Sequence, residues 1–316
     1  MRPIDTLTQM LEVAAALAAA PLFLGWVNQC RAWLQNRRAP SVWLPYRGIR
    51  KLFHKDAALA EGASPLFRVA PYVVFAAMVL IAAIVPSMGT RLPFTVAADA
   101  IALVGLLAMA RVFLSLAAMD IGTAFGTLGA RREMMVGFLA EPALLMVIFV
   151  ASLISGTTAL PAITENLATQ TPALYPSLAF TGIAFTMVLL AENARIPIDN
   201  PATHLELTMI HEATLLEYSA RHLALMEWAS ALKLFNYACI GFALFLPWGV
   251  STRADSPLTL LTSVPLLAVK LLVCGAGLAL IETLSAKLRV FRAPEFLATA
   301  YLFAVLGMLV HLLLRA

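Results

Sequence analysis

The stretch GFLAEPALLMVIFVASLISG, which runs from Gly137 to Gly156, decides the fold class of this chain. Its side chains are apolar almost throughout, and Glu141 is the one charged residue within it. A helix needs about 20 mostly apolar residues to cross the hydrocarbon core of a bilayer. Because the stretch is continuously apolar and does not alternate with polar residues, it predicts a membrane-spanning helix and not a barrel strand.

Seven further stretches of the same kind lie on either side of it. The eight predicted spans cover residues 7–27, 69–88, 99–119, 137–156, 174–193, 226–249, 258–280 and 296–314. The whole chain is 61% hydrophobic and only 13% charged, whereas about a quarter of a soluble domain is charged. This composition excludes a soluble domain. We predict an all-α, polytopic membrane protein with eight transmembrane helices, folded as a single membrane domain over residues 1–316.

The cysteine pattern excludes several kinds of redox and metal site. The chain has three cysteines, at positions 30, 239 and 274, and they form no CxxC pair. Iron–sulfur clusters and structural zinc sites take about four closely spaced ligands. The chain also lacks the GxxxxGKS or GxxxxGKT motif of a P-loop ATPase. We therefore expect no metal or cofactor on this chain, so any energy for work comes from a partner or an ion gradient.

The distribution of basic residues predicts how the chain lies across the membrane. Fifteen Lys and Arg residues fall in the loops after the first, third, fifth and seventh spans, and four fall on the other side. Cytoplasmic loops carry the excess of positive charge. We therefore expect the loops at about 28–68, 120–136, 194–225 and 281–295 to be cytoplasmic and both termini to lie on the outer, periplasmic side.

Five ionisable residues fall inside the apolar spans. They are Arg111, Glu141, Glu192, Lys233 and Lys270. Each costs about 2.5–3.5 kcal/mol at the centre of a bilayer, so we expect the set to face the bundle interior, to pair or to line water. Their depths run from the cytoplasmic surface to the middle of the membrane, which indicates a one-sided proton path. Snorkelling to an interface is an alternative for some of them, but not for Lys270.

The first cytoplasmic loop is basic and rich in aromatic residues, among them Trp33, Trp43, Tyr46 and Phe53. One interpretation is an amphipathic segment that lies on the anionic inner leaflet. The other is a docking surface for a soluble partner. Basic residues beside a span already have a topological explanation, so we expect no binding of nucleic acid.

The third cytoplasmic loop, residues 191–228, is acidic. No Gly or Pro occurs between 202 and 240, so a continuous helix would place Glu206 and Glu217 on one face. A solvated acidic loop is one interpretation. The acids alternate with large apolar residues, however, and acids are not favoured beside an anionic leaflet. This pattern favours buried acids that relay protons.

These two loops carry motifs of a known family. The run Glu192-Asn-Ala-Arg195-Ile-Pro197-Ile-Asp199, followed by Glu206-Leu207 and Glu217-Tyr218-Ser219, resembles the acidic loop of the complex I subunit 1 family. Residues Gln35, Arg37, Pro40, Pro45 and Lys51-Leu52 resemble its partner motif in the first loop. Within the family, the runs 120–126, 129–133, 141–142 and 282–294 are more similar to the membrane subunit of energy-converting NiFe hydrogenases and formate hydrogenlyases of the hydrogenase-4 type.

The resemblance covers nearly the whole chain and implies an integral membrane subunit of a multi-subunit oxidoreductase. Such a subunit anchors the peripheral arm and couples its electron transfer to proton or sodium translocation. The NiFe centre and the iron–sulfur clusters would lie in partners: hydrogenase large and small subunits, an iron–sulfur subunit and antiporter-like membrane subunits. The complex would sit in the lipid of a bacterial or archaeal cytoplasmic (inner) membrane.

The resemblance also suggests roles for individual residues. The predicted proton path consists of Glu141, Glu192, Glu206, Glu212, Glu217, Lys233 and Lys270. An ion pair between Arg195 and Asp199 would shape the loop beside the peripheral arm. The other residues expected at that interface are Arg37, Arg38, Lys51, Arg132 and Glu133.

Two other functions stay open. A quinone-site subunit of NADH:quinone oxidoreductase would need a cavity, which Trp33, Trp43 and Arg195 could line. Ala39 and Ala194 depart from the family pattern where quinone access would be built, which weakens this hypothesis. An independent secondary transporter would show an internal repeat, and none is visible.

Overall fold

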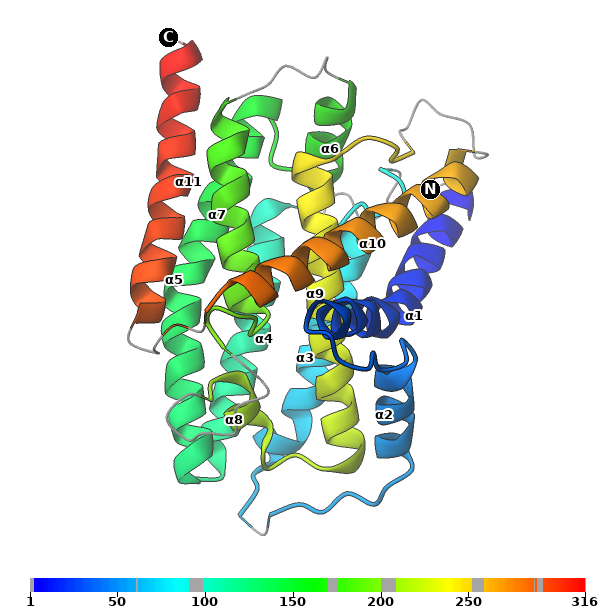
Figure 1. Cartoon of the computed structure of the whole chain (residues 1–316), viewed down its shortest axis with the longest axis vertical. Coiled ribbons are helices and arrows are strands. Elements are labelled where there is room, and N and C mark those ends of the chain that lie inside the picture. The colour runs from blue at the N-terminus through cyan, green and yellow to red at the C-terminus, as the bar shows by residue number, and fades with distance from the viewer. Residues whose placement is uncertain are drawn as a thin grey trace.

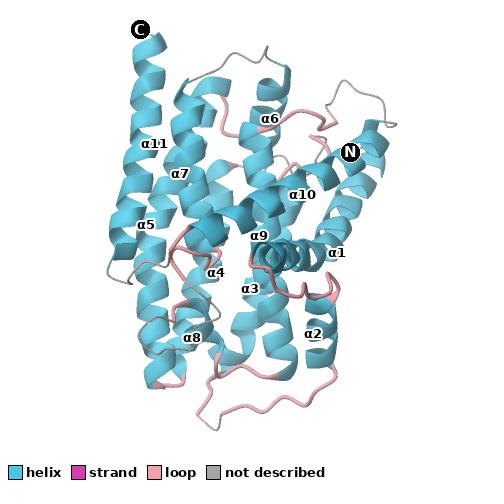
Figure 2. Cartoon of the chain, in the orientation of Figure 1, coloured by secondary structure: helices cyan, strands magenta, loops and turns pink. Residues whose placement is uncertain are grey.

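The computed structural model describes residues 3–60, 62–90, 99–169, 176–199, 209–251, 259–286, 288 and 292–315. The described residues form helices and connecting loops without a β-strand (Figures 1 and 2). The helices are α1 (Pro3–Leu34), α2 (Leu44–Phe53), α3 (Pro65–Ile84), α4 (Ala100–Asp120), α5 (Ala124–Ser155), α6 (Leu160–Thr169), α7 (Pro176–Glu192), α8 (His211–Leu215), α9 (Ala220–Phe245), α10 (Thr259–Leu284) and α11 (Ala293–Arg315).

The predicted all-α membrane fold is confirmed. Seven helices in the described part of the chain are long and apolar enough to cross a membrane: α1, α3, α4, α5, α9, α10 and α11. The remaining predicted span corresponds to α7, which is equally apolar but has only 17 described residues. Among the described residues, the eight expected spans thus correspond to seven helices of full length and to α7, of which 17 residues are described.

Two element boundaries differ from the sequence prediction. The predicted loop 120–136 is mostly helix, because α5 begins at Ala124 and continues for 32 residues. Thr123 starts it by accepting a hydrogen bond from the Gly126 N–H, and Gly156, with a φ of 70°, ends it. The long helix expected between 202 and 240 is also interrupted, since α8 ends at Leu215 and α9 begins at Ala220.

The break between α8 and α9 is fastened to the chain around α3. The Tyr218 hydroxyl donates to the Phe67 carbonyl at 3.1 Å, and the two rings stack with centroids 4.1 Å apart. The Ser219 hydroxyl donates to the Ala58 carbonyl at 2.6 Å. These bonds fix the direction in which α9 enters the bundle.

Helix α9 is the central element of the bundle. Its most apolar window is 72% buried, against 22% for α10. It packs against α3 and α1, while α5 packs against α4, α7 and α11. Helix α10 crosses the front of the bundle at a steep angle and lies against α1 (Figure 1).

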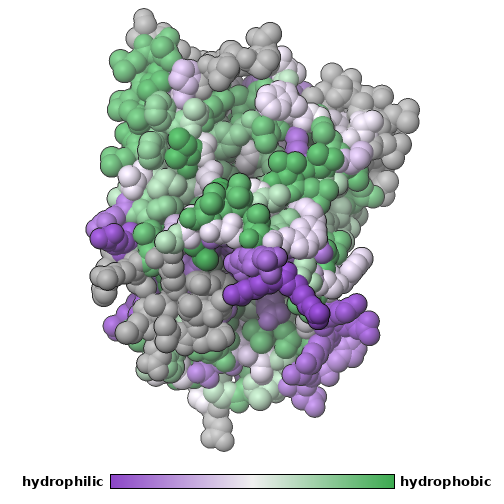
Figure 3. All heavy atoms as spheres, in the orientation of Figure 1, coloured by the Kyte–Doolittle hydropathy of each residue, from purple (hydrophilic) through white to green (hydrophobic). Residues whose placement is uncertain are grey.

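The two ends of the molecule differ in polarity. Hydrophilic side chains gather over α2 and the nearby end of α1, whereas hydrophobic side chains cover α10 and α11 (Figure 3). Helix α2 and helix α8 lie at one end of the bundle, and α6 lies at the other (Figure 1). Helix α2 contributes Arg47, Arg50 and Lys51 to the hydrophilic end, which we call the basic end.

Candidate functional site

Arg111 of α4 lies at the centre of a buried ion cluster. Its guanidinium contacts the carboxylates of Glu141 and Glu192, and its Nε lies 3.9 Å from Glu133 Oε1. The Lys233 Nζ lies 2.9 Å from the second oxygen of Glu192. Arg111 is 7% exposed and the Glu192 side chain only 1%. We call these five residues the Arg111 cluster.

Four helices bring the cluster together. Glu133 and Glu141 both belong to α5 and are eight residues apart, so they share a helix face. Glu192 is the last residue of α7, and Lys233 lies near the middle of α9. Residues far apart in the sequence thus meet inside the membrane domain.

Gly137 makes room for the guanidinium. It lies on α5 between the two acids, and a Cβ atom added there would be 2.1 Å from Arg111 Nη1. Any larger residue would therefore displace Arg111 from its carboxylates. The absence of a side chain at 137 allows the guanidinium to rest directly on the helix backbone.

The cluster contains three carboxyl groups and two cations. A buried charge is tolerated when an opposite charge and hydrogen bonds compensate it. Here the acids outnumber the cations, so one more proton can be accommodated without leaving a net positive charge. An arrangement of this kind can take up and release a proton with small movements of its side chains.

A small cavity lies beside the cluster. Its volume is about 40 Å³, and Arg111, Glu133, Lys233 and His211 contribute to its lining. One water needs about 10–15 Å³ of such space, so the cavity has room for water in contact with four polar side chains. His211 is the first residue of α8, and burial lowers the pKa of its imidazole.

The loop beside the cavity corrects one prediction. Arg195 pairs with Glu282 of α10, with Nη1 3.1 Å from Oε1, and not with Asp199. Asp199 Oδ2 instead accepts hydrogen bonds from the backbone N–H groups of Ile210 and His211, at 3.2 and 3.1 Å. Glu282 is buried against the end of α1, where Arg31 lies 3.5 Å from its other oxygen. The predicted Arg195–Asp199 ion pair is therefore wrong, because each group has another partner.

Lys270 does not belong to the cluster either. Its ammonium donates to the carbonyls of Leu246 and Trp248, each at 2.6 Å, where α9 ends. Leu246 follows Lys233 by thirteen residues, which is about 20 Å along the helix. Lys270 satisfies carbonyls at a helix end, where such groups have no partner within the helix. The predicted continuation from Lys233 to Lys270 thus spans two separate sites.

The remaining predicted residues divide into buried and exposed groups. Glu133 was expected at the peripheral surface and is instead buried in the Arg111 cluster. Arg132 donates to the Met209 carbonyl at 2.7 Å and so joins α5 to the segment before α8. Glu212 in α8 and Glu217 in the break between α8 and α9 are both half-buried, and Glu206 lies outside the described residues. The residues that remain exposed are Arg37, Arg38 and Lys51.

The expected quinone-like cavity does not form from its three predicted residues. Trp33 packs edge-on against Trp26, while Trp43 lies near Tyr46, and both predicted tryptophans are exposed. Trp43 borders a crevice of about 920 Å³ whose other lining residues come from α2 and its end. Those residues are Tyr46, Arg47, Arg50, Lys51 and His54. Arg195 is held elsewhere by Glu282.

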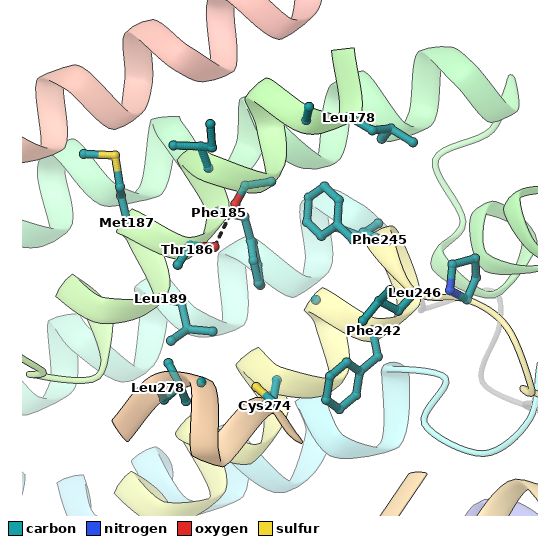
Figure 4. Close-up of a pocket in the computed structure, with 18 of the residues that line it drawn as sticks. Leu178, Phe185, Thr186, Met187, Leu189, Phe242, Phe245, Leu246, Cys274 and Leu278 are labelled. Atoms are coloured by element: carbon teal, nitrogen blue, oxygen red, sulfur yellow. Dashed lines mark hydrogen bonds between the residues drawn. The ribbon is translucent and has the colours of Figure 1, made fainter. Parts of the chain in front are cut away.

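A larger crevice opens between α7, α9 and α10 (Figure 4). It has a volume of about 1010 Å³, and its described lining contains no charged side chain. Phe185, Phe242 and Phe245 form much of its wall. Thr186 contributes little polarity, because its hydroxyl donates to the Gly182 carbonyl of its own helix at 2.8 Å. This crevice offers apolar contact and no group for proton transfer.

Sequence reasoning missed three residues of the site. Arg111 was recognised as one of the intramembrane charges but was left out of the predicted proton path and given no partner, although it contacts three of the acids. His211 gave no signal, because a histidine in an acidic loop is unremarkable until the fold places it beside Glu133. Glu282 stood in a motif used only for family resemblance, and its partners come from distant parts of the chain.

Comparisons with known proteins agree with this architecture. The sequence model described as NADH dehydrogenase matches residues 7–313. The chain is 35% identical to hydrogenase-4 component C of Escherichia coli (strain K12) over 264 residues, which cover 83% of this chain and 82% of that protein. It is 32% identical to formate hydrogenlyase subunit 4 of the same organism over 308 residues, 96% of this chain and 97% of that protein.

A solved structure shares the fold. A chain of the membrane-bound sulfane sulfur reductase, an archaeal respiratory membrane complex, superposes with a TM-score of 0.82 at 18% sequence identity. The match covers 96% of this chain and 98% of that chain. The predicted complex I subunit 1-like fold is thereby confirmed, and the chain belongs to the NADH dehydrogenase family of membrane proteins.

Proposed function

We propose that this protein is the integral membrane subunit of a multi-subunit oxidoreductase of the hydrogenase type. It anchors a peripheral arm and couples electron transfer in that arm to proton or sodium movement. The relatives named hydrogenase-4 component C and formate hydrogenlyase subunit 4 support this assignment over a quinone-site subunit or an independent transporter. The NiFe centre and the iron–sulfur clusters would lie in the hydrogenase and iron–sulfur partner subunits.

The Arg111 cluster is the observation that carries the coupling role. Five ionisable side chains from four helices meet at one buried place, which is costly in a membrane unless the charges serve a purpose. The cavity beside them holds His211 at its border, close to the segment that joins α7 to α8. Protons would enter through the His211 cavity, reach Glu133 and exchange among Glu192, Glu141 and Lys233.

The surface around this entry supports a docking role. Exposed Arg37 and Arg38 lie shortly before α2 in the chain and exposed Lys51 lies within it. The basic end would face the cytoplasm by the positive-inside rule and would meet the peripheral arm. Asp199 binds the start of α8, and Arg195 binds Glu282 near the end of α10. A displacement of residues 195–199 by the peripheral arm would therefore move both helices.

Replacement of Glu141 by Gln tests this proposal. Its side chain is 29% exposed, so the change should leave folding intact. In inverted membrane vesicles that contain the full complex, we expect the protons moved per electron transferred to fall by about tenfold or more, the scale on which a positioned acid or base acts. Sodium-dependent movement, measured in parallel, identifies the ion.

Glu295→Gln is the matched control, because it is the same chemical change at an exposed position in the first turn of α11. The Glu295→Gln complex should move as many protons per electron as the unmodified complex does. A Glu141→Gln complex that moves the normal number of ions per electron would contradict the coupling role. Absence of hydrogenase subunits from the complex purified through this chain would contradict the assignment of partners.

A further inference from the structure

A second buried acid lies beside the C-terminal end of α3, outside the Arg111 cluster. Glu12 of α1 is 3% exposed. Its Oε1 accepts a hydrogen bond from the Gly89 N–H at 2.8 Å, while its Oε2 is buried and has no hydrogen-bond partner. Gly89 lies just beyond the end of α3, where Met88 and Thr90 exchange backbone hydrogen bonds with Ser251.

The groups around Glu12 form a polar site. Ser87 lies two residues before Gly89, and Cys239 of α9 lines the same cavity as Ser87. Ser87, Cys239 and Lys270 line one cavity of about 10 Å³, roughly the size that a single water occupies. The titratable neighbours are therefore the thiol of Cys239 on α9 and the ammonium of Lys270 on α10, and no ion pair to Glu12 occurs among the described residues.

A structural role does not explain a carboxyl group at this position. Gln9, on the same helix one turn earlier, is also buried, and its amide donates to the Ala83 carbonyl at 2.8 Å. A Gln at position 12 would accept the Gly89 hydrogen bond equally well and would avoid the cost of burying an acid. The acid adds one thing that an amide lacks, which is an oxygen that can gain and lose a proton.

The Glu12 site is close to the Arg111 cluster along α9. Lys233 and Cys239 are six residues apart, which is about 9 Å. Two buried polar side chains, Asn236 and Tyr237, lie between them. Asn236 donates to the Met78 carbonyl at 2.9 Å, and Tyr237 interacts electrostatically with Glu192. Polar groups thus extend from the cluster to the far side of the bundle.

We propose that Glu12 is a proton-exchange site that serves the membrane face opposite the Arg111 cluster. The water-sized cavity beside Ser87 lies next to this site. The ligand is a proton, which Glu12 Oε2 binds and passes to water at the end of α3. This inference rests on the proposed coupling function, because it gives the transferred proton an exit through this same chain.

Chemical labelling of the unmodified complex tests the site without a mutation. Dicyclohexylcarbodiimide is an apolar reagent to which a protonated carboxyl group adds, and the adduct rearranges to an N-acylurea without loss of any atom. In membranes that contain the full complex, we expect mass spectrometry to find this adduct on Glu12. Its yield should decrease as the pH rises. A peptide with Glu12 unlabelled at every pH would overturn the proposal.

Two variants test whether the site is used. In inverted vesicles, Glu12→Gln should lower the protons moved per electron by about tenfold or more. Gln9→Leu, which changes a buried polar neighbour without removing an acid, should leave this ratio as it is. A normal ratio in the Glu12→Gln complex would overturn the exit role.

If Glu141→Gln lowers the ratio and Glu12→Gln does not, this inference alone fails. If only Glu12→Gln lowers it, the role of the Arg111 cluster fails instead.

Discussion

A single guanidinium organises the buried acids of this protein. Arg111 contacts carboxylates on two other helices and is always charged, because arginine does not lose its proton in proteins. A planar group with five donors can hold several acids at once, whereas the Lys233 ammonium contacts Glu192 as a point charge. Arg111 therefore fixes the positions of the acids, and in the proposed function the acids and Lys233 exchange protons.

Gly137→Ala is expected to disturb this arrangement. The new Cβ would lie 2.1 Å from Arg111 Nη1, so the guanidinium must move away from α5. Overpacking of this kind costs about 1–3 kcal/mol of stability. The protons moved per electron in inverted vesicles should fall with it. Gly105→Ala on α4 is the control, because nothing lies within 4 Å of the added atom. Equal stability and equal numbers of protons moved per electron in the two variants would show that Gly137 is not needed to seat the Arg111 guanidinium.

His211 should make the stability of the α8 region depend on pH. Burial lowers the pKa of its imidazole, so the folded chain binds a proton there less readily than the unfolded chain. The folded arrangement is therefore destabilised as the pH falls below about 6.5, the ordinary histidine value, and is unaffected above it. Hydrogen exchange of residues 209–219 between pH 5 and 8 measures this effect.

His211→Gln removes the titrating group and should remove the pH dependence of that exchange. A dependence of the same size in the variant would assign the effect to a residue other than His211. The comparison thus separates the imidazole from its neighbours.

The sequence predicted which residues carry buried charge but not how they pair. A charge within an apolar span is visible from hydropathy alone, and Glu141, Glu192 and Lys233 were found in this way. Pairing depends on which helices are neighbours, and nothing local in the sequence states this. The same limit explains why Arg195 was assigned to Asp199, four residues away, and not to Glu282 on α10.

At the scale of elements, α5 does more than cross the membrane. One face of this 32-residue helix carries Glu133, Gly137 and Glu141 against α4, and Gly129 receives α8. An added Cβ at Gly129 would lie 2.7 Å from the Ala213 Cβ and 3.1 Å from the Ile210 carbonyl oxygen. The same helix therefore positions both the ion cluster and the short helix that carries His211.

Gly129→Val should displace α8 from α5. Faster hydrogen exchange over residues 209–219, together with fewer protons moved per electron, is the expected result. Arg132 still ties α5 to Met209 in this variant, so the change should remain local. Unchanged exchange over 209–219 would show that α8 does not depend on this contact. Gly277→Ala, on α10 with open space around it, serves as the control.

The sequence predicted the existence of the helices better than their ends. Thr123 and Gly156 mark the boundaries of α5, but a hydropathy window centred on 137–156 hides the polar first turns of that helix. The break between α8 and α9 has no Gly or Pro. It depends on the contacts of Tyr218 and Ser219 with residues at and before α3, which are far away in the sequence.

At the scale of the whole molecule, the basic end that carries α2 is proposed to face the cytoplasm, and the end that carries α6 is proposed to face the periplasm. Cysteines introduced at Lys51 in α2 and at Thr169 in α6 lie at exposed positions at opposite ends of the bundle. A membrane-impermeant maleimide should label Lys51→Cys in inverted vesicles and Thr169→Cys in intact cells. The reverse pattern would invert the topology, and labelling of both from one side would contradict the fold. The native Cys30 and Cys239 are buried and should react little.

The overall class was fully predictable, since composition alone excluded a soluble domain and the motifs indicated the family. The steep crossing of α10 and the separation of Lys270 from Lys233 were not predictable, because they depend on packing angles between helices. The contact of Glu12 with Gly89 was missed for the same reason. An acid near the start of the first span looks peripheral until the end of α3 folds over it.

The end of α7 has an electrostatic consequence. Helix α7 terminates at Glu192, the acid whose two oxygens contact Arg111 and Lys233. The C-terminal end of a helix carries a partial negative charge, which adds to the charge of an acid placed there. Arg111 and Lys233 therefore offset the dipole of α7 as well as the carboxylate, so the loss of either cation should also loosen the last turn of that helix.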